Sequence, residues 1–232
     1  GIELVPQDTR EQLPMPLGLS MNYAHVTEDL DARKLRVAVG GVEVPKDAVS
    51  FDRLTQATDV FLARADAWVL PFLDVYGLAG YLQGTAKHIE VSLNGSPLPP
   101  FAVNYYGPIL GAGFALAGGY GPWFGVFDLN YTATDVNALT STVSTLTIDP
   151  RVGWRDRVFG VPLSAYVGAM YEGIQGTQSG STVENGLALS FDVQVRAQEP
   201  WNTLVGVQVE LTPRWSLIAE GAMGDRDQTL LS

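Results

Sequence analysis

The sequence contains no cysteine, and it has only two histidines and 14 lysine or arginine residues among 232. The absence of cysteine excludes a disulfide framework, thiolate metal sites and cysteine nucleophiles. The 25 acidic residues give a formal net charge of -11. Because nucleic-acid binding requires a basic surface, we expect no nucleic-acid partner. No basic segment followed by an apolar one precedes the first polar region, so we expect that any secretory signal was removed before Gly1.

Long apolar runs are also scarce. The nearest approach to a transmembrane helix covers residues 107–127, which contain no charged residue and are long enough to span a bilayer as a helix. However, it contains seven glycines together with Pro108 and Pro122, and a Gly-Gly-Tyr-Gly-Pro run lies within it. A helix would lose backbone order at the glycines and a hydrogen bond at Pro122. We interpret this stretch as two strands that meet at a turn.

Alternation with a period of two is the recurring positive signal. The odd positions from 123 to 131 are Trp, Gly, Phe, Leu and Tyr, whereas Asp128 and Asn130 occupy even positions. Similar alternation runs through 145–154, 161–172 and 205–212. This pattern indicates strands with one apolar and one polar face. Their lengths match the 9–11 residues that a tilted strand needs to cross a bilayer.

The connections between these strands alternate in length. We predict short turns at 71–72, 120–123, 154–157 and 212–215, a tight one at 225–227, and a loop of intermediate length at 135–141. Long polar segments fall at 25–56, 85–105 and 173–200. Outer-membrane barrels show this asymmetry, with short periplasmic turns and long extracellular loops.

Aromatic residues gather at two levels along the predicted strands. One set lies near the short turns: Trp68, Phe72, Tyr120, Trp123, Phe124, Trp154 and Trp215. The other lies toward the long loops: Tyr23, Tyr105, Tyr106, Tyr131, Tyr171 and Trp201. Two aromatic girdles are typical of a membrane barrel. A soluble lipocalin-like barrel or sandwich is the competing interpretation.

We therefore predict an all-β fold: a closed, antiparallel, up-and-down transmembrane β-barrel of about ten strands in a single domain over residues 1–232. Residues 1–16 form an N-terminal periplasmic segment in this interpretation. The expected strands are near 17–25, 57–70, 72–85, 106–118, 123–134, 142–154, 158–172, 201–212, 215–224 and from 227 onward. Eight or twelve strands stay open, because 26–56 and 186–196 can each contain a hairpin. Ser232 falls within the last predicted strand, so we also expect further residues to complete it.

Several stretches resemble proteobacterial outer-membrane barrel proteins: residues 66–81 (DAWVLPFLDVYGLAGY), 116–120 (LAGGY), 149–154 (DPRVGW) and 215–221 (WSLIAEG). These are patterns of girdles and turns that many barrel families share. The resemblance covers most of the chain as architecture. It implies the barrel fold and a location in the bacterial outer membrane, and it assigns no functional residue.

If the apolar faces contact lipid, the charged residues of the strands point into the barrel, because a charge at the bilayer midplane costs a few kcal/mol. The predicted pore-lining residues are Arg64, Asp66, Asp128, Asp149, Arg151, Glu172, Glu210 and Glu220. Acidic residues outnumber arginines in this set, which favours a channel with a weak preference for cations. The alternative is that Arg64, Asp66, Asp149 and Arg151 form one ion-pair network that closes the interior. Small residues on the strand 109–117 (Gly111, Gly113, Ala115 and Ala117) would either leave free cross-section beside that network or accommodate large neighbours such as Tyr166.

The predicted outer loops offer less chemistry. They contain Arg33, Lys34, Arg36, Lys46 and Lys87, which would pair with lipopolysaccharide phosphates or would simply be solvated. Glu28, Asp29 and Asp31 lack the spacing of a known divalent-cation loop, and no metal-ligand or phosphate-loop motif predicts a metal or cofactor. His25 lies near Ser20 and Asp29, and His88 lies near Glu90 and Ser92, but no nucleophile motif accompanies either histidine. We therefore predict that the protein is not an enzyme.

The leading functional hypothesis is a small outer-membrane channel for passive diffusion of small polar or amphipathic solutes. The alternative is a closed structural or surface-interaction barrel that works through its extracellular loops. The expected partners are outer-membrane lipid, lipopolysaccharide and small solutes. The oligomeric state stays open.

Overall fold

The computed structural model describes the backbone of residues 15–39, 42–43, 49–51, 54–89, 91–93, 96–97, 101–137, 142–175, 178–184, 187–196, 200–224 and 226–232. Side chains are described over 15–28, 56–85, 104–137, 142–173, 200–224 and 227–232. Within these residues, no helix is long and apolar enough to cross a membrane.

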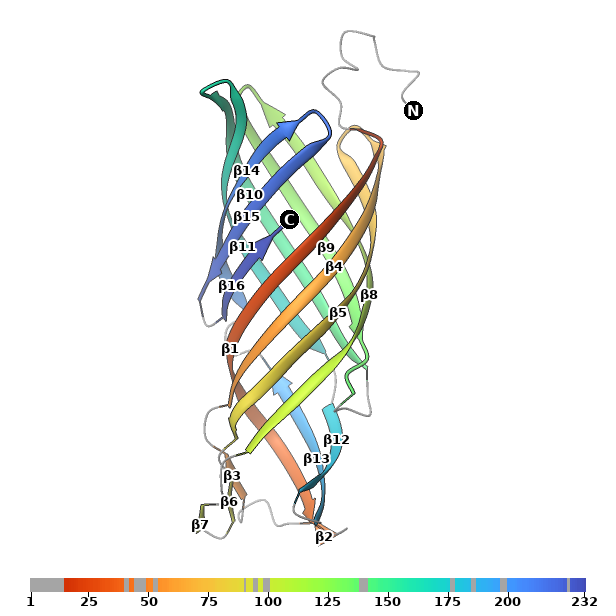
Figure 1. The fold of residues 1–232 in the computed structure, drawn as a ribbon, viewed down its shortest axis with the longest axis vertical. Helices are drawn as coiled ribbons and strands as arrows, with labels where there is room; N and C mark the ends of the chain where they lie inside the picture. Colours follow the sequence, from red (N-terminus) through yellow and green to blue (C-terminus); the bar gives the residue numbers. More distant parts are fainter. Residues whose placement is uncertain are drawn as a thin grey trace.

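Ten strands form the wall of a closed antiparallel barrel (Figure 1). They are β1 (Leu17–Val39), β4 (Leu54–Leu70), β5 (Leu73–Ile89), β8 (Phe101–Tyr120), β9 (Trp123–Thr134), β10 (Val143–Val158), β11 (Val161–Gln175), β14 (Trp201–Thr212), β15 (Trp215–Met223) and β16 (Arg226–Leu231). Each strand pairs with the next in this order, and β16 pairs with β1 to close the sheet. The closed up-and-down architecture and the predicted strand number are confirmed.

Both junctions of β16, including the closing seam with β1, are shorter than the other junctions of the wall. Strand β1 pairs with β4 from Leu17↔Ala67 to Leu30↔Leu54, but with β16 only from Tyr23↔Leu231 to Glu28↔Arg226. Reciprocal backbone hydrogen bonds of 2.8 and 3.0 Å between Ile218 and Ser232 extend the β15–β16 pairing by one residue.

Three of the predicted short turns lie where the sequence predicts them. Of the tight turn predicted at 225–227, residues 226 and 227 belong to β16, and residue 225 lies outside the described residues. Two-residue turns occur at residues 71–72, 121–122 and 213–214. The turn predicted at 154–157 is wrong, because β10 continues to Val158 and the chain reverses at Phe159 and Gly160. Both of these residues have positive φ, at 52° and 83°. A two-residue hairpin with positive φ at both positions follows the right-handed twist of its strands, which explains why the reversal occurs there.

At the opposite end, several strands continue past the barrel wall. Strand β1 extends to Val39 and pairs with β13 (Leu187–Arg196), which pairs with β12 (Gln178–Glu184); β2 (Val42–Glu43) also pairs with β1. A separate small sheet contains β3 (Val49–Phe51), β6 (Val91–Leu93) and β7 (Ser96–Pro97). Figure 1 shows these strands below the barrel. The predicted end of the first strand at residue 25 is therefore wrong, and the segments predicted as long loops contain strands.

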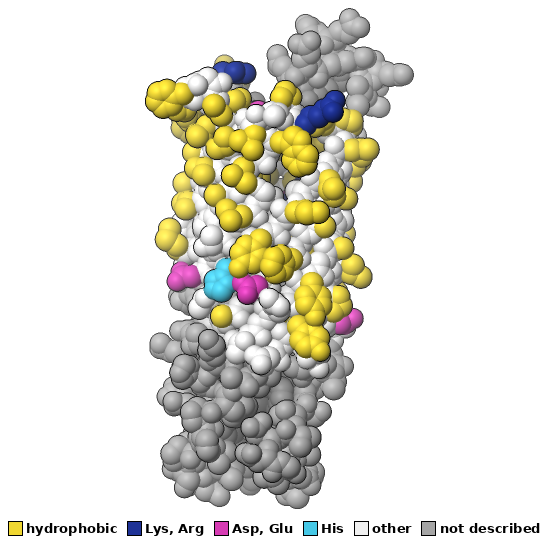
Figure 2. Space-filling model, in the orientation of Figure 1, with side chains coloured by type: hydrophobic (Ala, Val, Ile, Leu, Met, Phe, Trp, Pro, Cys, Tyr) yellow, Lys and Arg dark blue, Asp and Glu magenta, His cyan; other side chains and the backbone are white. Residues whose placement is uncertain are grey.

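The two faces of the wall differ in composition. Outward residues of β1 such as Leu19 and Met21 are exposed, as are Leu110 on β8 and Val167 on β11. On the face shown in Figure 2, hydrophobic side chains lie along the described wall, and the lysine or arginine side chains lie at the short-turn end. Inside the barrel, Tyr166, Met170, Leu204 and Ala222 form a small buried cluster that Phe124 packs against. An apolar exterior with a largely polar interior is the arrangement of a membrane barrel.

The aromatic side chains do not all face outward as the predicted girdles require. Tyr106 is exposed, but its neighbour Tyr105 points inward, where its hydroxyl hydrogen-bonds the Thr58 hydroxyl. Phe124 also packs inside. The girdle assignment is thus wrong for Tyr105 and Phe124, because adjacent residues on a strand face opposite sides. Outward aromatic contacts remain near the long-loop end at Tyr23–Phe61, Tyr81–Tyr106 and Tyr171–Trp201.

Candidate functional site in the barrel interior

The first of two charged groups inside the barrel surrounds Arg64 on β4. The guanidinium binds Asp74 on β5 at 2.5 Å and lies 3.5 Å from an oxygen of Asp128 on β9. Asp66, two residues along β4, lies 3.7 Å away. The Arg64 guanidinium carbon also lies 3.6 Å from the centre of the Tyr76 ring, which is close enough for a cation–π contact. We call these five residues the Arg64 group.

The second charged group surrounds Arg151 on β10. Its guanidinium makes two hydrogen bonds to Asp149, the Nε one at 2.9 Å, and lies 2.9 Å from Glu220 on β15. The Tyr166 hydroxyl on β11 donates to Glu220 at 2.8 Å, and its ring centre lies 5.4 Å from the guanidinium carbon. We call these four residues the Arg151 group. It repeats the composition of the first group, with one arginine, one tyrosine and an excess of carboxylates.

A glycine on an intervening strand lets each tyrosine reach its partner. Tyr76 on β5 donates to Asp128 on β9 at 2.5 Å, and β8 lies between these strands. A Cβ at Gly113 on β8 would lie 2.6 Å from the Tyr76 hydroxyl. The same relation holds for Tyr166, which lies against Gly206 on β14 and reaches Glu220 on β15. Tyr105 likewise lies against Gly84 on β5 and reaches Thr58 on β4.

This arrangement corrects one expectation about packing. The small residues of β8 accommodate Tyr76, and Tyr166 occupies the space over Gly206 instead. The expected single network of Arg64, Asp66, Asp149 and Arg151 is also not what forms, because the ion pairs fall into the Arg64 and Arg151 groups. Each arginine pairs with carboxylates that the register brings close on its own or nearby strands.

The interior holds more negative than positive charge. The two groups together contain five carboxylates and two arginines. Each arginine side chain retains 25% of its accessible surface. The predicted residues Glu172 and Glu210 lie on β11 and β14 at positions that alternation turns inward, and they are not among the nine residues that define the two groups. Their role in a pore stays a prediction.

Three of the nine residues in the two charged groups were absent from the predicted set: Asp74, Tyr76 and Tyr166. Asp74 is the most deeply buried of the carboxylates around Arg64, with 3% of its side-chain surface exposed. Alternation could have predicted its inward position, because residues 74 and 76 lie on the inward face of the strand that begins after the turn at 71–72. The tyrosines carried no signal of their own, since tyrosine is equally common in the outward girdles.

The contact that His25 makes in the structure differs from the neighbours expected from the sequence. The His25 Nδ1 lies 2.8 Å from Asp59 on the neighbouring strand, and the Tyr23 hydroxyl donates to the same carboxylate oxygen at 2.8 Å. The structure therefore gives His25 a partner, Asp59, that the sequence did not suggest, and the side chains of Asp29 and His88 fall outside the described residues. The described residues contain no group of three or more acidic or histidine side chains placed to hold a metal ion.

Comparisons with known proteins give structural alignments of low similarity. No family model matches the sequence, and no curated protein matches it. The transport unit of the autotransporter AIDA-I from Escherichia coli aligns with a TM-score of 0.38 and 10% identity, over 98% of this chain and 91% of that one. An outer membrane channel from Pseudomonas putida F1 aligns with a TM-score of 0.25 and 10% identity, over 98% of both chains.

Proposed function

We propose that the protein is a bacterial outer-membrane channel whose interior lets small polar solutes diffuse through and prefers cations. The observation that carries the proposal is the charge balance of the Arg64 and Arg151 groups, in which carboxylates outnumber arginines by five to two. A dry interior would require the surplus carboxylates either to take up protons or to stay ionised at a cost of several kcal/mol per ion. Water and mobile cations would remove that cost.

The exposure of the two arginines supports the same proposal, although their partners Asp74, Asp149 and Glu220 are buried. Both arginines keep a quarter of their surface accessible although they lie inside a closed wall. Rings of charged side chains set ion preference in pores, so the Arg64 and Arg151 groups are the proposed selectivity elements. Outer-membrane placement rests on the apolar exterior, the outward aromatic contacts and the polar interior.

The first test is single-channel recording of the refolded protein in a planar bilayer under a salt gradient. We expect steady openings and a reversal potential displaced toward that of the cation. Asp128→Asn and Asp149→Asn should each move the reversal potential toward zero, because each substitution removes one interior negative charge. The matched control is Asp227→Asn, which removes a charge from an exposed position on β16 and should leave selectivity unchanged. Unaltered selectivity in both interior variants would contradict the proposal.

A second function has support from one feature of the fold. Strands β1, β12 and β13 form a sheet that continues beyond the barrel wall. Such a projecting sheet would suit a closed barrel that binds partners at its long-loop end. Electrical silence from protein that shows heat-modifiable migration, and is therefore folded, would favour this second function over the channel.

A further inference from the structure

Each interior arginine joins two strands that are not neighbours in the wall. Arg64 on β4 lies 3.5 Å from Asp128 on β9, with β5 and β8 between these strands. Arg151 on β10 lies 2.9 Å from Glu220 on β15, with β11 and β14 between them. Both strands of the first bridge precede both strands of the second in the order of the wall. The two bridges therefore pass side by side and do not cross.

The two bridges divide the interior into three sectors. One outer sector lies against β5 and β8, and the other lies against β11 and β14. We call these the β5–β8 sector and the β11–β14 sector. The middle sector lies between the bridges, with the β9–β10 junction on one side and strands β16 and β1 on the other.

Packed side chains fill both outer sectors. In the β5–β8 sector, Tyr76 and Ala115 are buried. In the β11–β14 sector, Tyr166, Met170 and Leu204 belong to the buried cluster of the interior. Side chains packed at the density of a protein interior leave no room for a file of water molecules. Neither outer sector therefore offers a path along the barrel.

The accessible surface of the charged groups faces the middle sector. Tyr76 and Tyr166 lie in the outer sectors, with ring centres 3.6 and 5.4 Å from the guanidinium carbons of their own groups. A ring thus covers the outer face of each guanidinium, so the accessible 25% of each arginine side chain lies on the other face. Asp66 and Asp128 are 16% and 13% accessible, compared with 3–7% for the other three carboxylates.

Side chains on both walls of the middle sector are also partly accessible. Thr147 lies two residues from Asp149 on β10, and Leu230 on β16 pairs with Glu220, so both face the interior. Both are half-buried, whereas the inward residues of the outer sectors are buried. Accessible surface thus continues from the bridges to the wall on either side of the middle sector.

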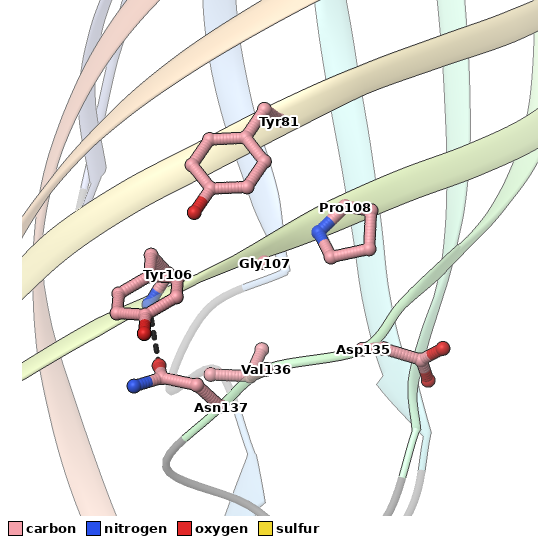
Figure 3. Close-up of a pocket in the computed structure, with 7 residues that line it drawn as sticks. All are labelled: Tyr81, Tyr106, Gly107, Pro108, Asp135, Val136 and Asn137. Carbon is pink, nitrogen blue, oxygen red and sulfur yellow. Dashed lines mark hydrogen bonds between the residues drawn. The ribbon is translucent and has the colours of Figure 1, made fainter.

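The pocket in the outer wall is separate from this path (Figure 3). Its two rings, Tyr81 and Tyr106, are exposed on the outside of the wall. Behind them the backbone ladder is continuous. The Asp135 amide donates to the Pro108 carbonyl at 3.2 Å, and the Asn137 amide donates to the carbonyl of Tyr106 at 2.9 Å. The pocket is therefore not a side entrance to the interior.

We propose that one water-filled path runs along the barrel through the middle sector, and that Asp66 and Asp128 are the carboxylates that a passing cation contacts there. The conduction of ions rests on the proposed function, whereas the position of the path follows from the two bridges and the packing behind them. Asp66 is then a specificity-determining residue, while Asp74, which binds Arg64 at 2.5 Å, holds the first bridge in place.

Single cysteine variants test the path, because the chain contains no cysteine of its own. Thr147→Cys and Leu230→Cys place a thiol in the middle sector. Ala115→Cys on β8 and Ser164→Cys on β11 place one at buried, inward positions of the outer sectors. Each full-length variant is refolded into vesicles, checked by heat-modifiable migration and treated with the water-soluble cation 2-(trimethylammonium)ethyl methanethiosulfonate. Mass spectrometry measures the fraction of protein modified with time.

We expect the two middle-sector variants to be modified at least tenfold faster than the two outer-sector variants, because a buried thiol reacts only when the structure opens locally. All four variants should react at the same rate in urea, which controls for thiol chemistry. Equal rates for the four folded variants would overturn the proposal, and so would faster modification in an outer sector. Protection of all four would also overturn it and would show that the bridges close the interior.

Selectivity measurements test the role of Asp66. Asp66→Asn should move the reversal potential toward zero by at least as much as Asp149→Asn, because Asp66 is the more accessible carboxylate. A smaller shift for Asp66→Asn would contradict this role.

The two readouts separate this inference from the channel proposal. A folded protein that is electrically silent but shows the expected pattern of modification would contradict the channel and support the position of the path. A conducting protein with equal modification of all four variants would overturn the position of the path alone.

Discussion

Interior glycines and tyrosines act as pairs. A tyrosine that reaches across one strand to a carboxylate on the next needs a position without a side chain in between, and Gly113 and Gly206 supply it. The hydroxyl then orients a carboxylate that also pairs with an arginine. The charge arrangement of the interior therefore depends on two residues that carry no charge and no side chain.

Valine at either glycine should destabilise the barrel. Gly113→Val and Gly206→Val each place new atoms where a tyrosine ring lies, and overpacking of this kind costs about 1–3 kcal/mol. The free energy of unfolding in urea, measured on protein refolded into vesicles, checks this expectation. Gly118→Val on β8 is the control, because nothing lies within 4 Å of a Cβ built there. A loss of stability as large in the control as in the other two variants would show that the tyrosine contacts are not the cause.

At the scale of single elements, the β10–β11 hairpin contains the one described non-glycine residue with positive φ. Phe159 has φ of 52° and its side chain is fully exposed. Left-handed backbone costs an L-residue other than glycine, asparagine or aspartate about 1–2 kcal/mol. The turn therefore contains strain that its side-chain contacts do not offset.

Relief of this strain is measurable. Phe159→Asn should raise the free energy of unfolding by about 1 kcal/mol, because asparagine tolerates this backbone conformation. Phe159→Leu keeps an apolar side chain and the strained backbone, so it should leave stability near that of the parent. The comparison is best made in detergent micelles, where a contribution of Phe159 as a membrane anchor is reduced. If both variants raised the free energy of unfolding by the same amount, the effect would come from removal of the aromatic ring and not from relief of backbone strain.

At the scale of the whole molecule, the barrel wall and the projecting sheet are joined through β1. The part of β1 that pairs with β4 ends at Leu30, and the part that pairs with β13 begins at Asp31. The ten wall strands close without any contribution from β12 or β13. We therefore expect the wall to form independently of the projecting hairpin.

Replacement of residues 176–199, which follow the end of β11 at Gln175, by a short Gly/Ser turn tests this independence. The variant should still show heat-modifiable migration and should keep the cation preference of the parent in planar bilayers, because both charged groups remain. If the protein instead works as a surface-interaction barrel, binding at the long-loop end should be lost while the wall stays folded. Failure of the variant to fold would show that the wall depends on the projecting sheet.

Much of this architecture was predictable because alternation is a local property of the sequence. The strict period of two in residues 123–131 and the breaker pairs at 71–72 and 121–122 determined strands, turns and the closed ten-stranded wall. The same alternation assigned Arg64, Asp128 and Arg151 to the interior. The turn at Phe159 and Gly160 was missed, since phenylalanine is not a residue that favours positive φ.

The sequence by itself determined the class of fold and placed Arg64, Asp66, Asp128, Asp149, Arg151 and Glu220 on the inward face, because both follow from residue type and parity along a strand. Only the tertiary structure decided which charges meet. Register between strands far apart in the chain brings Asp128 to Arg64 and Glu220 to Arg151, and it also brings Tyr81, Tyr106 and Asp135 around one pocket. Such contacts depend on the stagger and closure of all ten strands, and no local pattern of residues specifies that stagger.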